Sequence, residues 1–198
     1  MKNNNDITLK VKQLNNNKVI FTWNKNKTWL EILEIFGKIP LPPYLKRDSL
    51  PEDLITYQTI YSKDQGSIAS PTAGLHFTNG LLKRVKDKGV KIETVTLHIG
   101  LGTFRPVQVE DLNRHQMDSE YFEVSPKTSM AINQARKRHR KIIAVGTSTV
   151  RALETIAISG FQVTPKRGWT DKFIYPPYEF KMADKLITNF HQPQSTLM

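Results

Sequence analysis

Apolar and polar side chains alternate near the start of the chain. Residues 7–14 (ITLKVKQL) follow this pattern, and a second apolar run over residues 18–23 comes after three asparagines at 15–17. Asparagine tolerates left-handed backbone angles, so the pattern predicts a β-hairpin that turns at the asparagines. A short apolar segment follows over residues 28–36, and Gly37 ends it.

A proline-rich stretch then interrupts the pattern. The sequence GKIPLPPYLKR contains Pro40, Pro42 and Pro43, which favour an extended and rigid connector. We therefore predict a domain boundary near residue 40, with one domain over 1–40 and another over 41–198.

After the connector, helical and strand patterns alternate. The apolar spacing and the Ser-Pro and glycine signals predict helices over 74–88, 125–139 and 147–159, and strands over 90–99 and 141–145. Helices between strands indicate parallel strands joined by crossovers, so the expected fold class is α/β.

Composition excludes several classes of protein. Cysteine is absent, which excludes disulfides, thiolate metal sites and cysteine nucleophiles. The five histidines show no metal-ligand spacing, so no metal is expected. There is no apolar run of 18 residues and no apolar segment in the first ten. We expect no membrane association, a cytoplasmic location and a monomer.

The charge suggests a partner. The formal net charge is +11, a field that attracts polyanions, of which nucleic acid is the commonest. A general lysine bias is the alternative explanation. Residues 136–141 (RKRHRK) hold five basic side chains and are either a solvated helix end or a phosphate contact.

Three segments could carry chemistry. In the first, GSIASPTAGLHF (66–77), small residues precede a predicted helix and His76 falls in its first turn. A helix N-terminus disfavours imidazolium, which suits a base or a neutral hydrogen-bond partner. A capped helix with a buried histidine is the alternative.

The second segment, VTLHIGLGTFRP (95–106), contains a Gly-x-Gly pair. A dinucleotide-binding fingerprint needs a third glycine and a following helix, and Arg105-Pro106 stand there instead. We therefore interpret the glycines as letting the backbone approach a ligand, with Thr103 and Arg105 beside it.

The third segment, AVGTSTVRALE (144–154), predicts a strand, a glycine turn and a hydroxyl-rich helix start. Thr147, Ser148 and Thr149 could bind a carboxylate or phosphate there. Arg151 and Glu154 share a helix face and are expected to form a surface pair.

Seven segments in this order identify a family resemblance. The chain resembles the bacterial S-adenosylmethionine:tRNA ribosyltransferase-isomerases of queuosine biosynthesis over residues 37–196, through GKIPLPPYLKR, YQTIYSKDQGSIASPTAGLHFT, VTLHIGLGTFRPV, HQMDSEYFEV, IIAVGTSTVRALE, FIYPPYEFK and LITNFHQPQST.

The resemblance implies a reaction and a fold. Such enzymes transfer the ribosyl part of S-adenosylmethionine to 7-aminomethyl-7-deazaguanine at the tRNA wobble position, giving epoxyqueuosine, adenine and methionine. S-adenosylmethionine is thus a substrate, and no metal is needed. The family fold is an α/β barrel with an inserted β-barrel domain. Residues 1–40 would be the C-terminal part of the insert, and 41–198 an incomplete α/β barrel.

The chain also departs from the family pattern. It is expected to lack the family's N-terminal portion and its last elements. Asp118 stands where a second histidine is usual, and Gln192 and Gln194 vary the usual Leu-Pro-Lys. The alternative function is therefore a catalytically inactive fragment or short relative that at most binds tRNA. An ordinary methyltransferase fits poorly, because no helix pattern follows GLGTFRP.

Motif position and chemical fit suggest roles for individual residues. His76 and Glu120 are the candidate base and acid, with His191 in reserve. The candidate substrate-binding residues are Thr72, Thr103, Arg105, Thr147, Ser148, Thr149, Arg151 and Asn189.

Overall fold

The computed structural model describes residues 7–14, 18–159 and 161–196. The chain divides into two compact units, Met1–Ile39 and Pro40–Met198. Which domains of the family these units correspond to stays a prediction.

The first unit contains the predicted hairpin. Strand β1 (Leu9–Leu14) pairs antiparallel with β2 (Lys18–Trp23), and helix α1 (Trp29–Phe36) follows. The expected turn at the asparagines lies outside the described residues. The Trp29 ring on α1 lies 5.8 Å from that of Trp23, so aromatic contacts join the helix to the hairpin.

Helix α1 begins where its sequence predicts. The Thr28 hydroxyl accepts a hydrogen bond from the Glu31 N–H, and the Glu31 carboxylate accepts one from the Thr28 N–H. This reciprocal pair satisfies two backbone donors at the helix start. Gly37 follows the last helical residue in extended conformation.

The second unit contains four α-helices and four 3₁₀ turns among its described residues. The helices are α2 (Asp53–Thr56), α3 (Asn79–Asp87), α4 (Pro126–Lys137) and α5 (Thr147–Ile156). The 3₁₀ turns are η1 (Pro43–Leu45), η2 (Thr72–His76), η3 (Leu101–Phe104) and η4 (Leu112–Arg114).

The strands of the second unit form three small sheets. β3 (Thr96–His98), β4 (Glu120–Val124) and β8 (Lys166–Thr170) make an antiparallel sheet in the order β3-β4-β8. β5 (Ile143–Val145) pairs parallel with β9 (Lys185–Ile187). β6 (Ala157–Ile158) pairs antiparallel with β7 (Gln162–Val163).

The mixed α/β class is confirmed, but the expected strand direction is wrong for the main sheet. Alternating helices and strands predict parallel pairing only if consecutive strands are neighbours. Here β5 is not part of the main sheet and pairs with β9 instead, while β4 lies between two antiparallel partners, β3 and β8. The described residues form no closed barrel.

Several predicted boundaries also change. The helix expected over 74–88 is two elements, because Phe77 is extended and Thr78 caps a new helix with its hydroxyl. The strand expected over 90–99 is reduced to β3, since β4 offers partners only to Thr96–His98. The expected buried strand over 141–145 is short, and Ile143 is half exposed.

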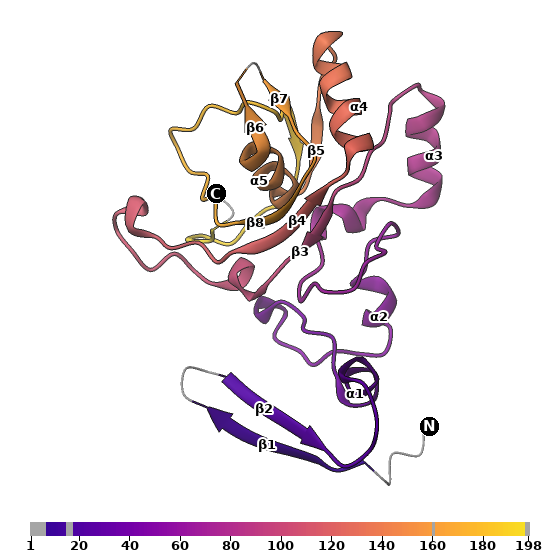
Figure 1. Cartoon of the computed structure of the whole chain (residues 1–198), viewed down its shortest axis with the longest axis vertical. Helices are drawn as coiled ribbons and strands as arrows, with labels where there is room; N and C mark the ends of the chain where they lie inside the picture. The colour runs from indigo at the N-terminus through magenta and orange to yellow at the C-terminus, as the bar shows by residue number, and fades with distance from the viewer. Residues whose placement is uncertain (1–6, 15–17, 160, 197–198) are drawn as a thin grey trace. The chain divides into compact units, whose positions relative to one another are not determined.

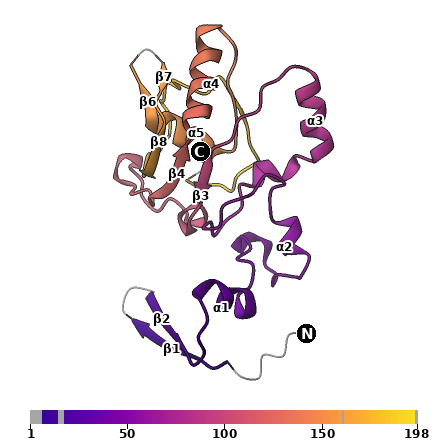
Figure 2. The same ribbon diagram turned by 45° about the vertical axis from the view of Figure 1, so that its right-hand side comes forward.

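The core lies between the main sheet and two helices. Phe122 and Val124 on β4 pack with Leu153 and Ile156 of α5 and with Ile132 of α4, which lie beside the sheet in Figures 1 and 2. Burial of each such side chain contributes roughly 1.5–3 kcal/mol. The core therefore fixes α5 against the sheet, with its N-terminus at the end of β5.

Candidate functional site

A small pocket lies at the N-terminus of α5. Its volume is about 40 Å³, and segments far apart in the sequence meet around it. Its lining includes seven of the predicted site residues, namely Thr72, Thr103, Thr147, Ser148, Thr149, Asn189 and His191. Four others, His76, Arg105, Glu120 and Arg151, are not part of this lining.

A glycine turn directs the helix N-terminus into the pocket. Gly146 has φ +86° and ψ 143°, a conformation that favours glycine, and its N–H donates to the Ile187 carbonyl at 2.9 Å. The first hydrogen bonds of α5 run from Thr149 and Val150 to the Gly146 carbonyl. The amides of Thr147 and Ser148 precede them, so the positive end of the helix dipole faces the pocket.

A hydrogen-bonded chain of three side chains lies beside the pocket. His76 Nε2 is 2.9 Å from Asn189 Oδ1, and Asn189 Nδ2 donates to Thr72 Oγ1 at 2.6 Å. With Asn189 Oδ1 as the acceptor, His76 Nε2–H is the donor, and the neutral form of the ring then has its lone pair on Nδ1. The His76 ring is thereby oriented by Asn189, which lies 113 residues further along the chain.

The position of His76 differs from the expected one. It ends η2 and does not lie in the first turn of α3, so the argument from a helix N-terminus does not apply to it. It is exposed, which also rules out a buried histidine. Its orientation comes from Asn189 and not from a helix dipole.

The segment that carries Asn189 is fixed at both ends. Before it, β9 pairs with β5. After it, the Val107 N–H donates to the Gln194 carbonyl at 2.7 Å. Within the segment, His191 Nε2 lies 3.3 Å from the Thr188 hydroxyl. Asn189 and His191 are therefore held at the pocket by neighbours distant in sequence.

Glu120 and Arg151 form a buried ion pair. Their side chains are 6% and 7% exposed, and Arg151 Nη1 donates to Glu120 Oε2 at 2.8 Å. The Gly100 N–H donates to the other carboxylate oxygen at 3.2 Å. Burial raises the pKa of Glu120, and the charge of Arg151 and the Gly100 N–H oppose that rise.

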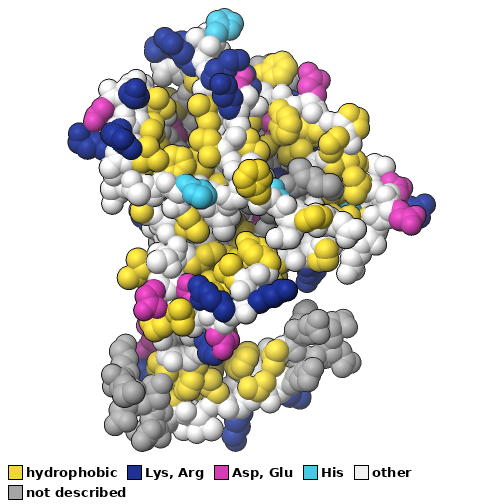
Figure 3. Space-filling model, turned by 180° about the vertical axis from the view of Figure 1, so that it is seen from behind, with side chains coloured by type: hydrophobic (Ala, Val, Ile, Leu, Met, Phe, Trp, Pro, Cys, Tyr) yellow, Lys and Arg dark blue, Asp and Glu magenta, His cyan; other side chains and the backbone are white. Residues whose placement is uncertain are grey.

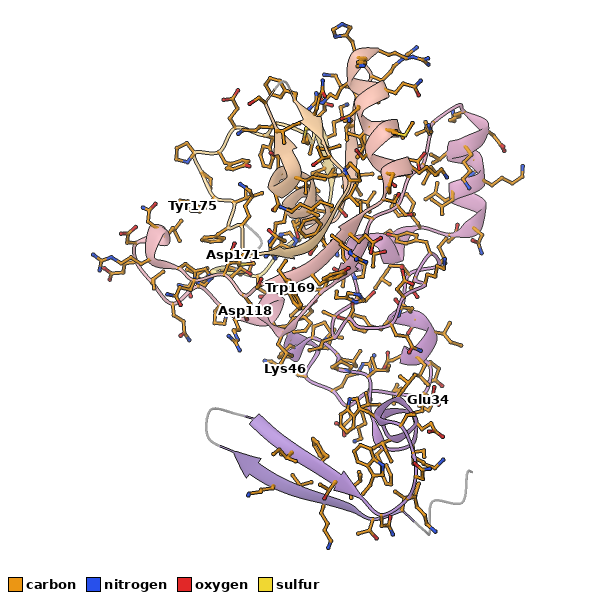
Figure 4. All side chains as sticks on the ribbon, viewed as in Figure 1. Glu34, Lys46, Asp118, Trp169, Asp171 and Tyr175 are labelled. Carbon is orange, nitrogen blue, oxygen red and sulfur yellow. The ribbon has the colours of Figure 1, made fainter. Side chains whose placement is uncertain are left out.

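The remaining donors of Arg151 bind backbone carbonyls. They reach the carbonyls of Asp118, Thr170 and Lys172 at 3.1–3.3 Å. Asp118 precedes β4 and Asp171 follows β8, and Figure 4 labels both at this end of the sheet. Arg151 thus joins α5 to the ends of two strands.

Arg105 lies at a second, larger pocket. This pocket has a volume of about 350 Å³, and Arg105, Arg114 and His115 contribute to its lining. Arg105 also pairs with Asp118 at 3.1 Å. A Cβ on Gly102 would lie 2.5 Å from Asp118, so the close approach that this glycine allows is to Asp118.

Sequence reasoning missed some residues. Ser70 and Thr188 also line the small pocket, and their place within the SPTAGLH and TNFHQ segments was the available signal. The expected surface pair of Arg151 and Glu154 is wrong, because both are buried. Glu154 instead accepts hydrogen bonds from the N–H groups of residues 181–183.

The described residues contain neither a metal-ligand cluster nor a helix that could span a membrane. No group of three His, Cys, Asp or Glu side chains among them could hold a metal ion. No helix in that part of the chain has both the length and the apolar character needed to cross a bilayer.

Comparisons with known proteins agree with the resemblance. The S-adenosylmethionine:tRNA ribosyltransferase-isomerase of Desulforamulus reducens is 50% identical over 179 residues, which is 90% of this chain and 52% of the relative. The protein of the same name from Pelotomaculum thermopropionicum is 54% identical over 168 residues, which is 85% of this chain and 49% of that relative. The chain spans about half the length of the curated relatives it matches.

A solved structure and a family model also match. The crystal structure of an S-adenosylmethionine tRNA ribosyltransferase from Thermotoga maritima is 43% identical with a TM-score of 0.50, covering 63% of this chain and 38% of that one. The family model described as queuosine biosynthesis protein matches residues 2–198. The chain therefore belongs to the queuosine biosynthesis protein family.

Proposed function

We propose that this chain carries the reaction site of a ribosyltransferase-isomerase. It transfers and isomerises the ribosyl moiety of S-adenosylmethionine onto 7-aminomethyl-7-deazaguanine at the wobble position of tRNA, with release of adenine and methionine. The observation that carries the proposal is the meeting of the His76–Asn189–Thr72 chain and the α5 N-terminus at one pocket.

The α5 N-terminus suits the carboxylate of the methionine part. The amides and hydroxyls of Thr147, Ser148 and Thr149 are neutral donors at the positive end of a helix dipole. A pocket of about 40 Å³ has room for one small group and not for the whole substrate. Thr103, on the same lining, would contact the ribose.

The reaction removes two protons and delivers one, because the sulfonium charge is lost when methionine departs as a neutral thioether. The substrate amine and the carbon next to the sulfonium each lose a proton to a base; departing adenine gains one proton, and the other goes to solvent. His76 is the proposed base, through the Nδ1 lone pair that its bond to Asn189 leaves available. It can return the same proton to adenine, and His191 is the reserve donor on the pocket lining.

The proposed role of Glu120 and Arg151 is positioning. Both are buried and bound to each other, and neither is part of the lining of the small pocket, so neither is placed to contact a substrate there. Their contacts hold α5 against β4 and β8, which keeps the helix N-terminus at the pocket. Arg105 is exposed and would contact the tRNA.

The architecture of the whole protein is part of the proposal. Residues 41–198 would form part of an α/β barrel, and residues 1–40 the end of an inserted β-barrel domain. The substrate tRNA fits a cytoplasmic location.

Adenine release is the test. The chain is incubated with S-adenosylmethionine and with tRNA carrying the aminomethyl-deazaguanine, beside a control without tRNA. Release that depends on the tRNA supports the proposal, whereas S-adenosylhomocysteine as the by-product contradicts it. No release from protein that melts cooperatively would favour an inactive fragment or short relative that at most binds tRNA.

A further inference from the structure

The end of α4 concentrates positive charge. Among its basic residues, Arg136 and Lys141 are paired, since both lie within 3.5 Å of Asp184. Burial alone would raise the pKa of Asp184, but the Ile142 N–H and these two cations hold it below its usual value. One carboxylate is thus shared by two cations.

Five other cations around this point are uncompensated. They are exposed, and none forms an ion pair with any residue that the structure describes. This basic patch consists of Lys137, Arg138, Arg140, Lys181 and Lys185. Figure 3 shows Lys and Arg side chains crowded at the top of the second unit, where Figure 1 has the end of α4.

Backbone contacts bring the members of the patch together. Arg136, next to Lys137, donates to the Lys181 carbonyl. The Lys185 N–H donates to the Ile142 carbonyl at 3.2 Å. The patch is therefore built from two segments more than 40 residues apart, and the fold fixes their juxtaposition.

We infer that the basic patch binds the phosphate backbone of the tRNA, apart from the nucleotide that reacts. The identity of the RNA rests on the proposed function. Five clustered cations without counter-charges suit a polyanion with regularly spaced phosphates. A membrane surface fits less well, because the apolar residues Ala131 and Ile132 of α4 are buried in the protein.

Compensation of the helix dipole does not account for the patch. Cations in the last turn of a helix are favourable, which explains Lys137 and Arg138. It does not explain Lys181 and Lys185, which come from a different segment.

One tRNA can reach both the patch and the pocket. Lys141, which follows Arg140 of the patch, and Gly146 of the pocket lining lie at opposite ends of β5, and five residues span at most about 18 Å. That separation is far smaller than a folded RNA of this kind.

The test compares two variants with the same change of charge. The patch variant is Lys137→Gln/Arg138→Gln/Arg140→Gln. The control variant is Arg84→Gln/Lys86→Gln/Lys88→Gln, on and just after α3, where the three side chains are also exposed. Binding of tRNA is measured over a series of salt concentrations, and cooperative melting verifies the folding of each.

We expect the patch variant to bind about tenfold or more weakly at 0.1 M salt, with a salt slope shallower by about two. The tRNA affinity of the control variant should change less than threefold. The variant Arg138→Lys/Arg140→Lys should keep the affinity, since the charge is retained. An equal loss of tRNA affinity in the patch and control variants would overturn the inference. Binding to anionic phospholipid vesicles is measured as well, and a patch variant that loses vesicle binding but keeps its tRNA binding would also overturn the inference.

The inference and the proposed function fail in different ways. If only the patch variant loses tRNA binding and the unaltered chain releases no adenine, the role of the patch is supported and the proposed enzymatic function is contradicted. If the unaltered chain releases adenine and the patch variant binds tRNA normally, the proposed function is supported and the role of the patch is contradicted. The absence of any tRNA binding by the unaltered chain would overturn the role of the patch.

Discussion

Arg151 on α5 and Glu120 at the start of β4 form a buried ion pair with an N–O distance of 2.8 Å. The pair joins the helix whose N-terminus bounds the pocket to the central strand of the main sheet. This contact, together with the packing of α5 in the core, therefore helps to keep the amides of the helix N-terminus at the pocket.

Replacement of Arg151 by Met should destabilise the chain strongly. It leaves the Glu120 carboxylate buried without its partner, which typically costs about 3–5 kcal/mol. Urea unfolding measures the change in the free energy of unfolding. The control is Arg105→Met, whose pair with Asp118 is exposed and should cost less than about 1 kcal/mol. Equal effects of the two substitutions would contradict the distinction drawn between them.

His76→Ala should reduce tRNA-dependent adenine release by about 10²- to 10⁴-fold, the range for loss of a general base. Asn189→Ala should cause a smaller loss, about 10- to 100-fold, because it removes only the orienting contact. Rates are measured at saturating tRNA across pH. His139→Ala, at an exposed histidine, is the control. A His76→Ala rate that is unchanged at all pH values would exclude His76 as the base.

Asp53 should make stability fall at low pH. Arg47 donates to both of its carboxylate oxygens, at 2.7 and 2.8 Å, and the Leu50 N–H donates as well. These contacts lower the pKa of Asp53 to about 2, from an ordinary value of 3.8. Since the folded state holds this proton less tightly, the contribution is full above pH 3.8 and is lost as the pH falls through about 2.

The variant Asp53→Asn isolates this contribution. The difference in unfolding free energy between the unaltered chain and the variant should be largest above pH 3.8 and should close toward pH 2. Urea unfolding at several pH values measures it. A difference that stays constant with pH would show that the lowered pKa does not contribute.

Gly146→Ala should destabilise the chain by about 1–3 kcal/mol through the backbone alone. A Cβ at this position meets no atom within 4 Å, but φ is +86°. Gly168→Ala on β8 is a matched control, because its Cβ is equally unobstructed and its φ is not in the left-handed region. Thermal unfolding compares the two. Similar melting temperatures would refute the importance of this turn.

Short-range features of the fold were predictable from the sequence. The alternation over residues 7–14 and 18–23 gave the strands of the hairpin, and Ser125-Pro126 gave the start of α4. These signals involve atoms within a few residues of one another, such as the Ser125 hydroxyl and the Thr128 N–H. The glycine turn before α5 was also predictable, because it too depends on residues close in sequence.

Pairings between distant segments were not predictable. The same strand pattern is compatible with parallel or antiparallel neighbours, and only packing of Phe122 and Val124 against α4 and α5 selects the arrangement.

For the candidate site, the sequence by itself determined which residue types are present: the histidines, the hydroxyls after Gly146, and the excess of cations. Only the tertiary structure decided their partners. It joined His76 to Asn189, buried Glu120 against Arg151, and left the five cations of the basic patch without an ion-pair partner among the residues that the structure describes. The physical reason is that hydrogen bonding, burial and charge pairing depend on distance in space, which the fold sets and sequence spacing does not.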